Sequence, residues 1–165
     1  MDPIAWVFGW PNRRNARALA AASAPTAVVA QLLIQEVPEI ADGVVAIKGI
    51  ARKPGHRTKV LVQSLTRGVD AIASVTGAAN KRVTRIAAAL EGEKVDVIPW
   101  KKDPELLIRM LLSPANVAEV DLDAEQRRAT IVLRHEDPLT TLYLSAPENL
   151  ELASELSGYR IETRP

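Results

Sequence analysis

Apolar residues recur at helical spacing in the stretch TAVVAQLLIQEVPEIADG, residues 26–43. The positions that set this spacing are Val28, Val29, Leu32, Leu33 and Val37. Such a pattern of threes and fours marks one face of an α-helix. Pro38 and Gly43 come next, and both residue types disfavour a continuing helix. We therefore expect a helix that begins near residue 26 and has ended by residue 43.

Stretches rich in β-branched residues follow this helix. VVAIKGIARKPG (44–55) and RTKVLVQS (57–64) alternate in part between apolar and polar residues, as half-buried strands do. The sequence KPGH between them suits a hairpin turn. A third alternating stretch, KVDVIPW (94–100), predicts another strand.

Two shorter helical patterns lie before that third strand. GVDAIASVTG (68–77) predicts a short helix that ends at Gly77, and NKRVTRIAAALEG (80–92) predicts a second helix that ends near Gly92. The apolar stripe of the second helix consists of Val83, Ile86, Ala87 and Leu90. We expect Lys81, Arg82 and Arg85 on its opposite, solvent-facing side.

The same order of elements returns after residue 102. DPELLIRMLL predicts a helix with Asp103 as its N-cap and Pro104 at its first position. Two strands (NVAEVDLD and RRATIVLRH), two helices (DPLTTLYL and PENLELASELSG) and a last strand (YRIET) follow it. LEGEKVDV (90–97) also aligns with LSGYRIET (156–163). Because order and residues both repeat, we predict an α+β fold built from two duplicated units.

Charge is divided unevenly along the 165 residues, although the formal net charge is only +1. Residues 44–110 carry 13 Lys and Arg against 6 Asp and Glu, whereas residues 111–165 carry 5 against 10. A polyanionic partner is attracted to the basic middle of such a chain. Chance bias between two solvated faces is the alternative explanation.

The sequence lacks the residues that several kinds of functional site require. The chain has no cysteine, which excludes disulfides and thiolate metal sites and suits a reducing cytoplasm. Its two histidines, His56 and His135, are far apart in sequence and form no metal-binding motif. GAANKRVTR is not a phosphate-binding P-loop, because the second glycine and the G-K-[S/T] ending are missing. We therefore expect no enzyme, no cofactor, no metal and no small-molecule substrate.

The first 25 residues form an N-terminal extension of uncertain role. Its apolar part is interrupted by Pro25 and follows Arg13, Arg14 and Arg17, so we favour a helical extension over a secretory signal and expect no membrane association. Trp6, Phe8 and Trp10 form an apolar patch. That patch either packs on the core or anchors a partner.

Particular stretches of the chain resemble a known family. The sequences EVPEIADGVVAIKGIARKPGHRTKVLV, LEGEKVDVIPW, LLSPANV and LSGYRI are similar to the tandem KH region of the bacterial transcription factor NusA. With the shorter matches VD (69–70) and RV (82–83), the resemblance spans residues 36–161. It implies two prokaryotic-type (type II) KH domains, each a three-stranded sheet with helices on one face. We place them at residues 26–102 and 103–165.

The resemblance also implies a function in transcription elongation, termination or antitermination. KH domains hold about four nucleotides of single-stranded RNA at a Gly-x-x-Gly turn between two helices. Glycine allows close approach of the RNA backbone, and the following helix offers its N–H groups to a phosphate. The implied partners are single-stranded RNA and, among proteins, RNA polymerase or other transcription proteins.

The first such turn is degenerate but keeps some of these features. It reads Gly77, Ala78, Ala79 and Asn80; Asn tolerates left-handed backbone and often caps helices. Lys81, Arg82 and Arg85 follow on the next helix. On the hairpin, Arg52, Lys53, Arg57 and Lys59 are either additional phosphate contacts or ordinary solvated charges. We expect weak RNA binding through this first domain.

The second turn keeps neither glycine. It reads Leu144, Ser145, Ala146 and Pro147, and SAPE has the pattern of a capping box with Ser145 as N-cap and Glu148 at the third helical position. The acidic helix that follows opposes phosphate binding, so we expect a structural role only. Two alternatives to RNA binding stay open: a KH scaffold reused for protein interaction on RNA polymerase or the ribosome, and a scaffold unit in a larger assembly.

Overall fold

The computed structural model describes residues 24–134 and 137–164. The chain divides into two compact units, the first ending at Trp100 and the second beginning at Lys101. The domain limits 26–102 and 103–165 stay predictions, and the N-terminal patch, the arginines before Pro25 and His135 lie outside the described residues.

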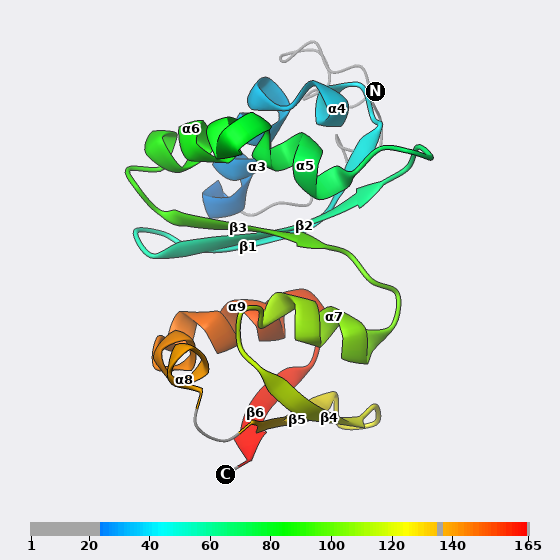
Figure 1. The fold of residues 1–165 in the computed structure, drawn as a ribbon, viewed down its shortest axis with the longest axis vertical. Helices are drawn as coiled ribbons and strands as arrows, with labels where there is room; N and C mark the ends of the chain where they lie inside the picture. The colour runs from blue at the N-terminus through cyan, green and yellow to red at the C-terminus, as the bar shows by residue number, and fades with distance from the viewer. Residues whose placement is uncertain (1–23, 135–136, 165) are drawn as a thin grey trace. The chain divides into compact units, whose positions relative to one another are not determined.

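The first unit pairs three strands with helices that cover one face of the sheet (Figure 1). In chain order its elements are α3 (Ala24–Glu36), α4 (Pro38–Ala41), β1 (Val45–Lys53), β2 (Arg57–Ser64), α5 (Ala71–Thr76), the 3-10 turn η1 (Ala78–Asn80), α6 (Lys81–Ala89) and β3 (Lys94–Pro99). The sheet order is β1-β2-β3. β1 and β2 form the predicted hairpin, whereas β3 runs parallel to β2. A parallel neighbour requires a crossover connection, and α5, η1 and α6 provide it.

The core of the first unit lies between these helices and the sheet. It contains Val29, Leu33, Val37, Ile40, Val45, Ile47, Val60, Val62, Val75, Ile86 and Leu90. The predicted helical stripe of 26–43 is thus buried, although the chain forms two helices there because Pro38 starts α4 anew. The core fixes α5 and α6 against the sheet, and with them the turn that joins these two helices.

The second unit repeats this order of elements. They are α7 (Pro104–Leu111), β4 (Val117–Asp123), β5 (Arg128–Leu133), α8 (Pro138–Leu144), α9 (Pro147–Ser157) and β6 (Arg160–Arg164). Its sheet order is β4-β5-β6, again antiparallel and then parallel, with helices on one face (Figure 1). Both hairpins also shift register near the start of their first strand. Asp103 caps α7 as expected by accepting a hydrogen bond from the Glu105 amide.

The fold predicted from the sequence is therefore confirmed. The structure is α+β, with a three-stranded sheet in each unit and helices on one face, as in two tandem prokaryotic-type KH domains. Among the described residues, no helix has the length and apolar character needed to cross a membrane.

Candidate nucleic-acid interface

The turn between α5 and α6 has an unusual backbone. Gly77 adopts φ 73° and ψ 172°, a region that is essentially restricted to glycine. Ala79 and Asn80 then have φ values of 51° and 58°, so two consecutive residues without glycine's freedom are left-handed. The expected left-handed Asn80 is present. Its expected capping role is wrong, because the Asn80 side chain makes no capping hydrogen bond to α6.

The residues of this turn face solvent. Ala78, Ala79, Asn80 and Lys81 are all exposed, and the amide of Asn80 donates to the Gly77 carbonyl at 3.2 Å. α5 is fixed ahead of the turn by Asp70, whose carboxylate accepts from the Ala73 amide at 3.0 Å. An RNA backbone therefore has direct access to the turn and to the start of α6.

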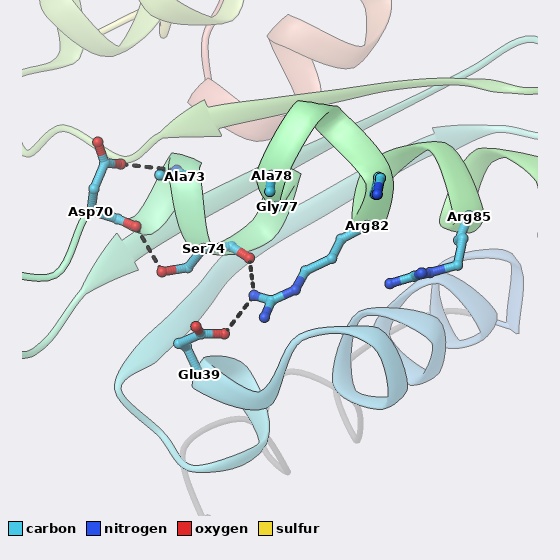
Figure 2. A pocket seen from close by; sticks show the side chains of 9 residues that line it. Glu39, Asp70, Ala73, Ser74, Gly77, Ala78, Arg82 and Arg85 are labelled. Atoms are coloured by element: carbon cyan, nitrogen blue, oxygen red, sulfur yellow. Dashed lines mark hydrogen bonds and ion pairs between the residues drawn. The ribbon is translucent and has the colours of Figure 1, made fainter.

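A groove of about 490 Å³ lies beside the turn (Figure 2). Its lining residues are Glu39, Asp70, Ala73, Ser74, Gly77, Ala78, Lys81, Arg82 and Arg85. They come from α4, from α5 with its preceding cap, from the turn, and from the first residues of α6. The structure thus brings five of the predicted RNA-binding residues to one groove, together with two carboxylates.

Arg82 is held inside this groove rather than pointing freely into solvent. Its Nη1 donates to Glu39 Oε2 at 2.8 Å and to the Ser74 carbonyl at 2.6 Å (Figure 2). Its side chain is only 26% exposed. Arg82 is therefore not the free solvent-facing cation that we expected, because Glu39 of α4 supplies a carboxylate within hydrogen-bonding distance of its guanidinium.

Gly77 has a steric role in this arrangement. A Cβ atom added there would lie 2.7 Å from Cγ of Arg82, which is closer than real Cβ contacts come. The missing side chain of Gly77 thus leaves the space through which the Arg82 stem passes.

The remaining cations of α6 are more accessible. Lys81 is exposed, and the Arg85 side chain is 60% exposed while its Nε donates to Glu36 Oε2 at 2.8 Å. An exposed ion pair of this kind contributes little to stability, so Arg85 exchanges partners easily.

Arg52 belongs to a buried network at the end of the hairpin. Its Nε and Nη2 donate to the Glu93 carboxylate at 2.6–3.1 Å, and its Nη1 donates to the Pro25 carbonyl at 2.8 Å. Glu93, with a side chain only 2% exposed, also accepts from the Gly55 amide and from Thr58 Oγ1. Arg52 therefore joins α3, the hairpin turn and the loop before β3, and its guanidinium is paired within the protein rather than only with solvent.

Burial disfavours the charged form of Glu93, but its partners outweigh that effect. The hydrogen bonds from Arg52, Gly55 and Thr58, with the attraction of the Arg52 charge, hold the pKa of Glu93 below its ordinary value. The carboxylate is therefore a stable acceptor at neutral pH.

Arg57 and Lys59 share a second carboxylate. Arg57 Nη1 donates to Asp96 at 2.7–2.8 Å, and Lys59 Nζ donates to the same group at 3.0 Å. The Lys59 side chain is fully buried. That burial lowers the pKa of Lys59, which Asp96 only partly offsets. Arg57, 12% exposed, and Lys59 are thus paired with Asp96 and help to join β2 to β3. Lys53 is partly buried on β1, and its phosphate contact stays a proposal.

The corresponding turn of the second unit is built differently. Ser145 is the C-cap of α8 and donates to the Leu142 carbonyl at 2.6 Å, while Ala146 is the N-cap of α9 and makes no side-chain cap. The predicted capping box is therefore wrong, because α9 begins one residue later than it requires. Asn149 instead donates to the Tyr143 carbonyl at 2.6 Å and is 1% exposed.

Sequence reasoning missed the acidic partners of these cations. Glu36, Glu39, Glu93 and Asp96 lie 37 to 49 residues from the arginines or lysine they bind. No local spacing signals such pairs. In the part of the chain that the structure describes, no group of three or more His, Asp or Glu side chains is placed to hold a metal ion.

Comparisons with known proteins agree with this geometry. Residues 24–100 match the family model of the NusA-like first KH domain. The chain is 45% identical over 130 residues to the transcription termination/antitermination protein NusA of Thermus thermophilus, covering 79% of this chain and 33% of that protein. It is 37% identical over 137 residues to NusA of Mycobacterium tuberculosis H37Rv, covering 83% of this chain and 40% of that protein.

A solved structure gives the same fold with little sequence similarity. The protein titled "Crystal structure of APE1850" matches with a TM-score of 0.58 at 14% identity, covering 81% of this chain and 94% of that one. The chain spans between a third and two fifths of the length of the NusA relatives named above. The exposed degenerate turn at Gly77–Asn80, the two sheets and these matches together show that residues 24–100 form a NusA-like first KH domain in a chain that resembles the tandem KH region of NusA.

Proposed function

We propose that this chain binds single-stranded RNA weakly through its first unit, in transcription elongation, termination or antitermination. The observation that carries the proposal is the exposed turn at residues 78–80, with left-handed Ala79 and Asn80, which leads directly into the cationic start of α6. RNA polymerase or other transcription proteins are the proposed protein partners. Catalysis forms no part of this function.

The residues divide into contacts and supports. Gly77, Ala78, Ala79 and Asn80 offer backbone to the ribose–phosphate strand, and the start of α6 offers N–H groups and a positive dipole end. Lys81, Arg82 and Arg85 supply charge. Such phosphate contacts are sensitive to salt and nearly independent of base sequence.

The hairpin cations contribute differently. Arg52 and Arg57 hold the sheet end together through Glu93 and Asp96, so they support the site without contacting RNA. Lys53 remains a proposed additional phosphate contact. Weak binding follows from a groove whose described lining residues include few free cations, no second glycine and no aromatic side chain.

The direct test is RNA binding measured by fluorescence anisotropy with a labelled single-stranded oligonucleotide at two salt concentrations. The double variant Lys81→Glu, Arg85→Glu is expected to weaken binding at least tenfold at low salt and to flatten the salt dependence. The matched control is Arg67→Glu, Lys94→Glu, which makes the same change in net charge; both side chains are exposed in the same unit, and neither is among the lining residues of the groove. Equal affinity of the double variant and the control would remove the proposal.

A second candidate function is supported by one feature of the second unit. Leu139 and Leu142 on α8 are 67% and 70% exposed, which is unusual for large apolar side chains on one short helix. They favour a KH scaffold reused for protein interaction, with RNA polymerase or the ribosome as partner. Partner capture that survives nuclease treatment and is lost in Leu139→Ser, Leu142→Ser supports this candidate over RNA binding.

A further inference from the structure

A carboxylate lies inside the cationic groove and already holds one of its arginines. Glu39 of α4 lines the groove and its side chain is 33% exposed. Its Oε2 accepts from Arg82 Nη1 at 2.8 Å (Figure 2). The charge that an RNA phosphate would use is therefore shared with a group of the protein itself.

The guanidinium of Arg82 is fixed by more than this ion pair. The same Nη1 donates to the Ser74 carbonyl in α5, and the stem of the side chain passes over Gly77. The side chain is thus directed across the turn toward α4. Its stem also covers the face of Gly77 that a missing side chain leaves open.

A phosphate and the Glu39 carboxylate are similar ligands for Arg82. The carboxylate is planar and the phosphate is tetrahedral, but both are anions that present two oxygens to accept charge-assisted hydrogen bonds from a guanidinium. A phosphate that approaches Arg82 must displace the Glu39 carboxylate or lie beside it. Two anions in close contact repel each other even near a solvated surface.

The second carboxylate of the groove has another task. Asp70 accepts from the Ala73 amide at 3.0 Å and caps α5, so removing its charge would also weaken the helix. Glu39 lies in the first turn of the short helix α4, and among the described residues no side chain makes a capping hydrogen bond at the start of that helix. Glu39 is therefore the acidic residue whose charge can be changed with little effect on the turn.

We propose that Glu39 limits the affinity of this groove for RNA by competing with phosphate for Arg82. The inference rests on the proposed function and adds an affinity-setting residue to it. A phosphate that binds Arg82 replaces the Glu39 carboxylate as its charged partner, so this exchange adds little to the free energy of RNA binding. Removal of the carboxylate charge leaves Arg82 available and makes the potential of the groove more positive.

The test uses Glu39→Gln in the full chain. Glutamine keeps the length and an oxygen acceptor for Arg82, so only the charge is lost; thermal unfolding followed by circular dichroism checks that the fold is kept. Anisotropy with a labelled single-stranded RNA is expected to show about fivefold tighter binding at low salt. The salt dependence of log K should steepen by roughly 0.7, as for one additional phosphate contact.

Two further variants make the result specific. Glu105→Gln removes the same charge from the Glu105–Arg109 pair of the second unit and should leave affinity within about twofold, because exposed charges elsewhere are screened. In an Arg82→Gln background, Glu39→Gln should increase the affinity for RNA clearly less than it does when Arg82 is present, because no guanidinium remains to be released.

The outcomes separate this inference from the function on which it rests. Measurable wild-type binding that Glu39→Gln leaves unchanged or weakens overturns the inference and leaves the proposed function standing. If Glu39→Gln increases the affinity for RNA equally with Arg82 and with Arg82→Gln, then Glu39 does not act by competing for Arg82. Absence of binding by both the wild type and Glu39→Gln overturns the inference and the proposed function together.

Discussion

The two units close the same end of their sheets with different chemistry. In the first unit, Arg52 pairs across the hairpin with Thr58, and both bind Glu93, which directly precedes β3. The register of the second unit places Leu122, Ala129 and Tyr159 at the corresponding positions. Ala129 and Tyr159 are buried there. One fold thus accepts either a buried ion pair or apolar and aromatic residues at these positions.

The turns between the two helices also differ, because a charged side chain joins the helices in the first unit and a neutral one joins them in the second. In both units a side chain from the first turn of the second helix donates to a carbonyl of the first helix: Arg82 to Ser74 and Asn149 to Tyr143. The first of these side chains is a cation in an open groove, and the second is a buried neutral amide. A hydrogen bond from the second helix to the first is therefore common to both units, whereas the charged donor and its exposed groove belong to the first unit.

The largest effect is expected from breaking the ion pair at the sheet end. Arg52→Leu leaves the Glu93 carboxylate buried with one partner fewer, which should lower the free energy of unfolding by about 3 kcal/mol. The triple variant Arg52→Leu, Thr58→Ala, Glu93→Tyr reproduces the residues of the second unit and should recover most of that loss. Urea unfolding followed by circular dichroism measures both. A triple variant as unstable as the single one would show that the two ends are not interchangeable.

The next effect concerns the turns. Gly77→Ala places a Cβ in a backbone region reserved for glycine and 2.7 Å from the Arg82 stem, so we expect about 2 kcal/mol of destabilisation. Ala146→Gly is a contrasting change in the turn of the second unit, at a position with ordinary extended backbone (φ −86°, ψ 108°). It should lower stability by less than about 1 kcal/mol. Similar losses for both variants in urea unfolding would contradict a special backbone at Gly77.

A pH titration sharpens the comparison of the sheet ends. The folded chain holds the pKa of Glu93 below its ordinary value of 4.5, so the stability that this carboxylate contributes is fully present above about pH 4.5. That contribution is lost as pH falls from there through the lowered pKa, because the unfolded chain binds the proton first. Thermal unfolding of Glu93→Gln should therefore depend less on pH below 4.5 than that of the wild type. Parallel pH profiles would show that Glu93 is not the residue responsible.

The elements of both units follow from the sequence because apolar periodicity and turn residues are local. The stripe at 26–43, the alternation at 94–100 and the Asp103 cap each lie within one element. The ion pairs of Arg52, Arg57 and Arg82 could not be predicted, because the acidic partners lie about 40 residues away and only the fold brings them together. The left-handed Ala79 carries no residue-type signal at all, since it is fixed by the helices on either side.

The smallest effect tests the error at the second turn. Ser145 has the residue type and spacing of an N-cap, yet its hydroxyl donates to the Leu142 carbonyl behind it rather than accepting from α9. Ser145→Ala should therefore change the free energy of unfolding by about 0.5 kcal/mol or less. Asp103→Ala removes a cap that does accept from its helix and should lower stability by about 1 kcal/mol. A loss at Ser145 as large as that at Asp103, measured by urea unfolding, would restore the capping box and remove the physical difference between the starts of α7 and α9.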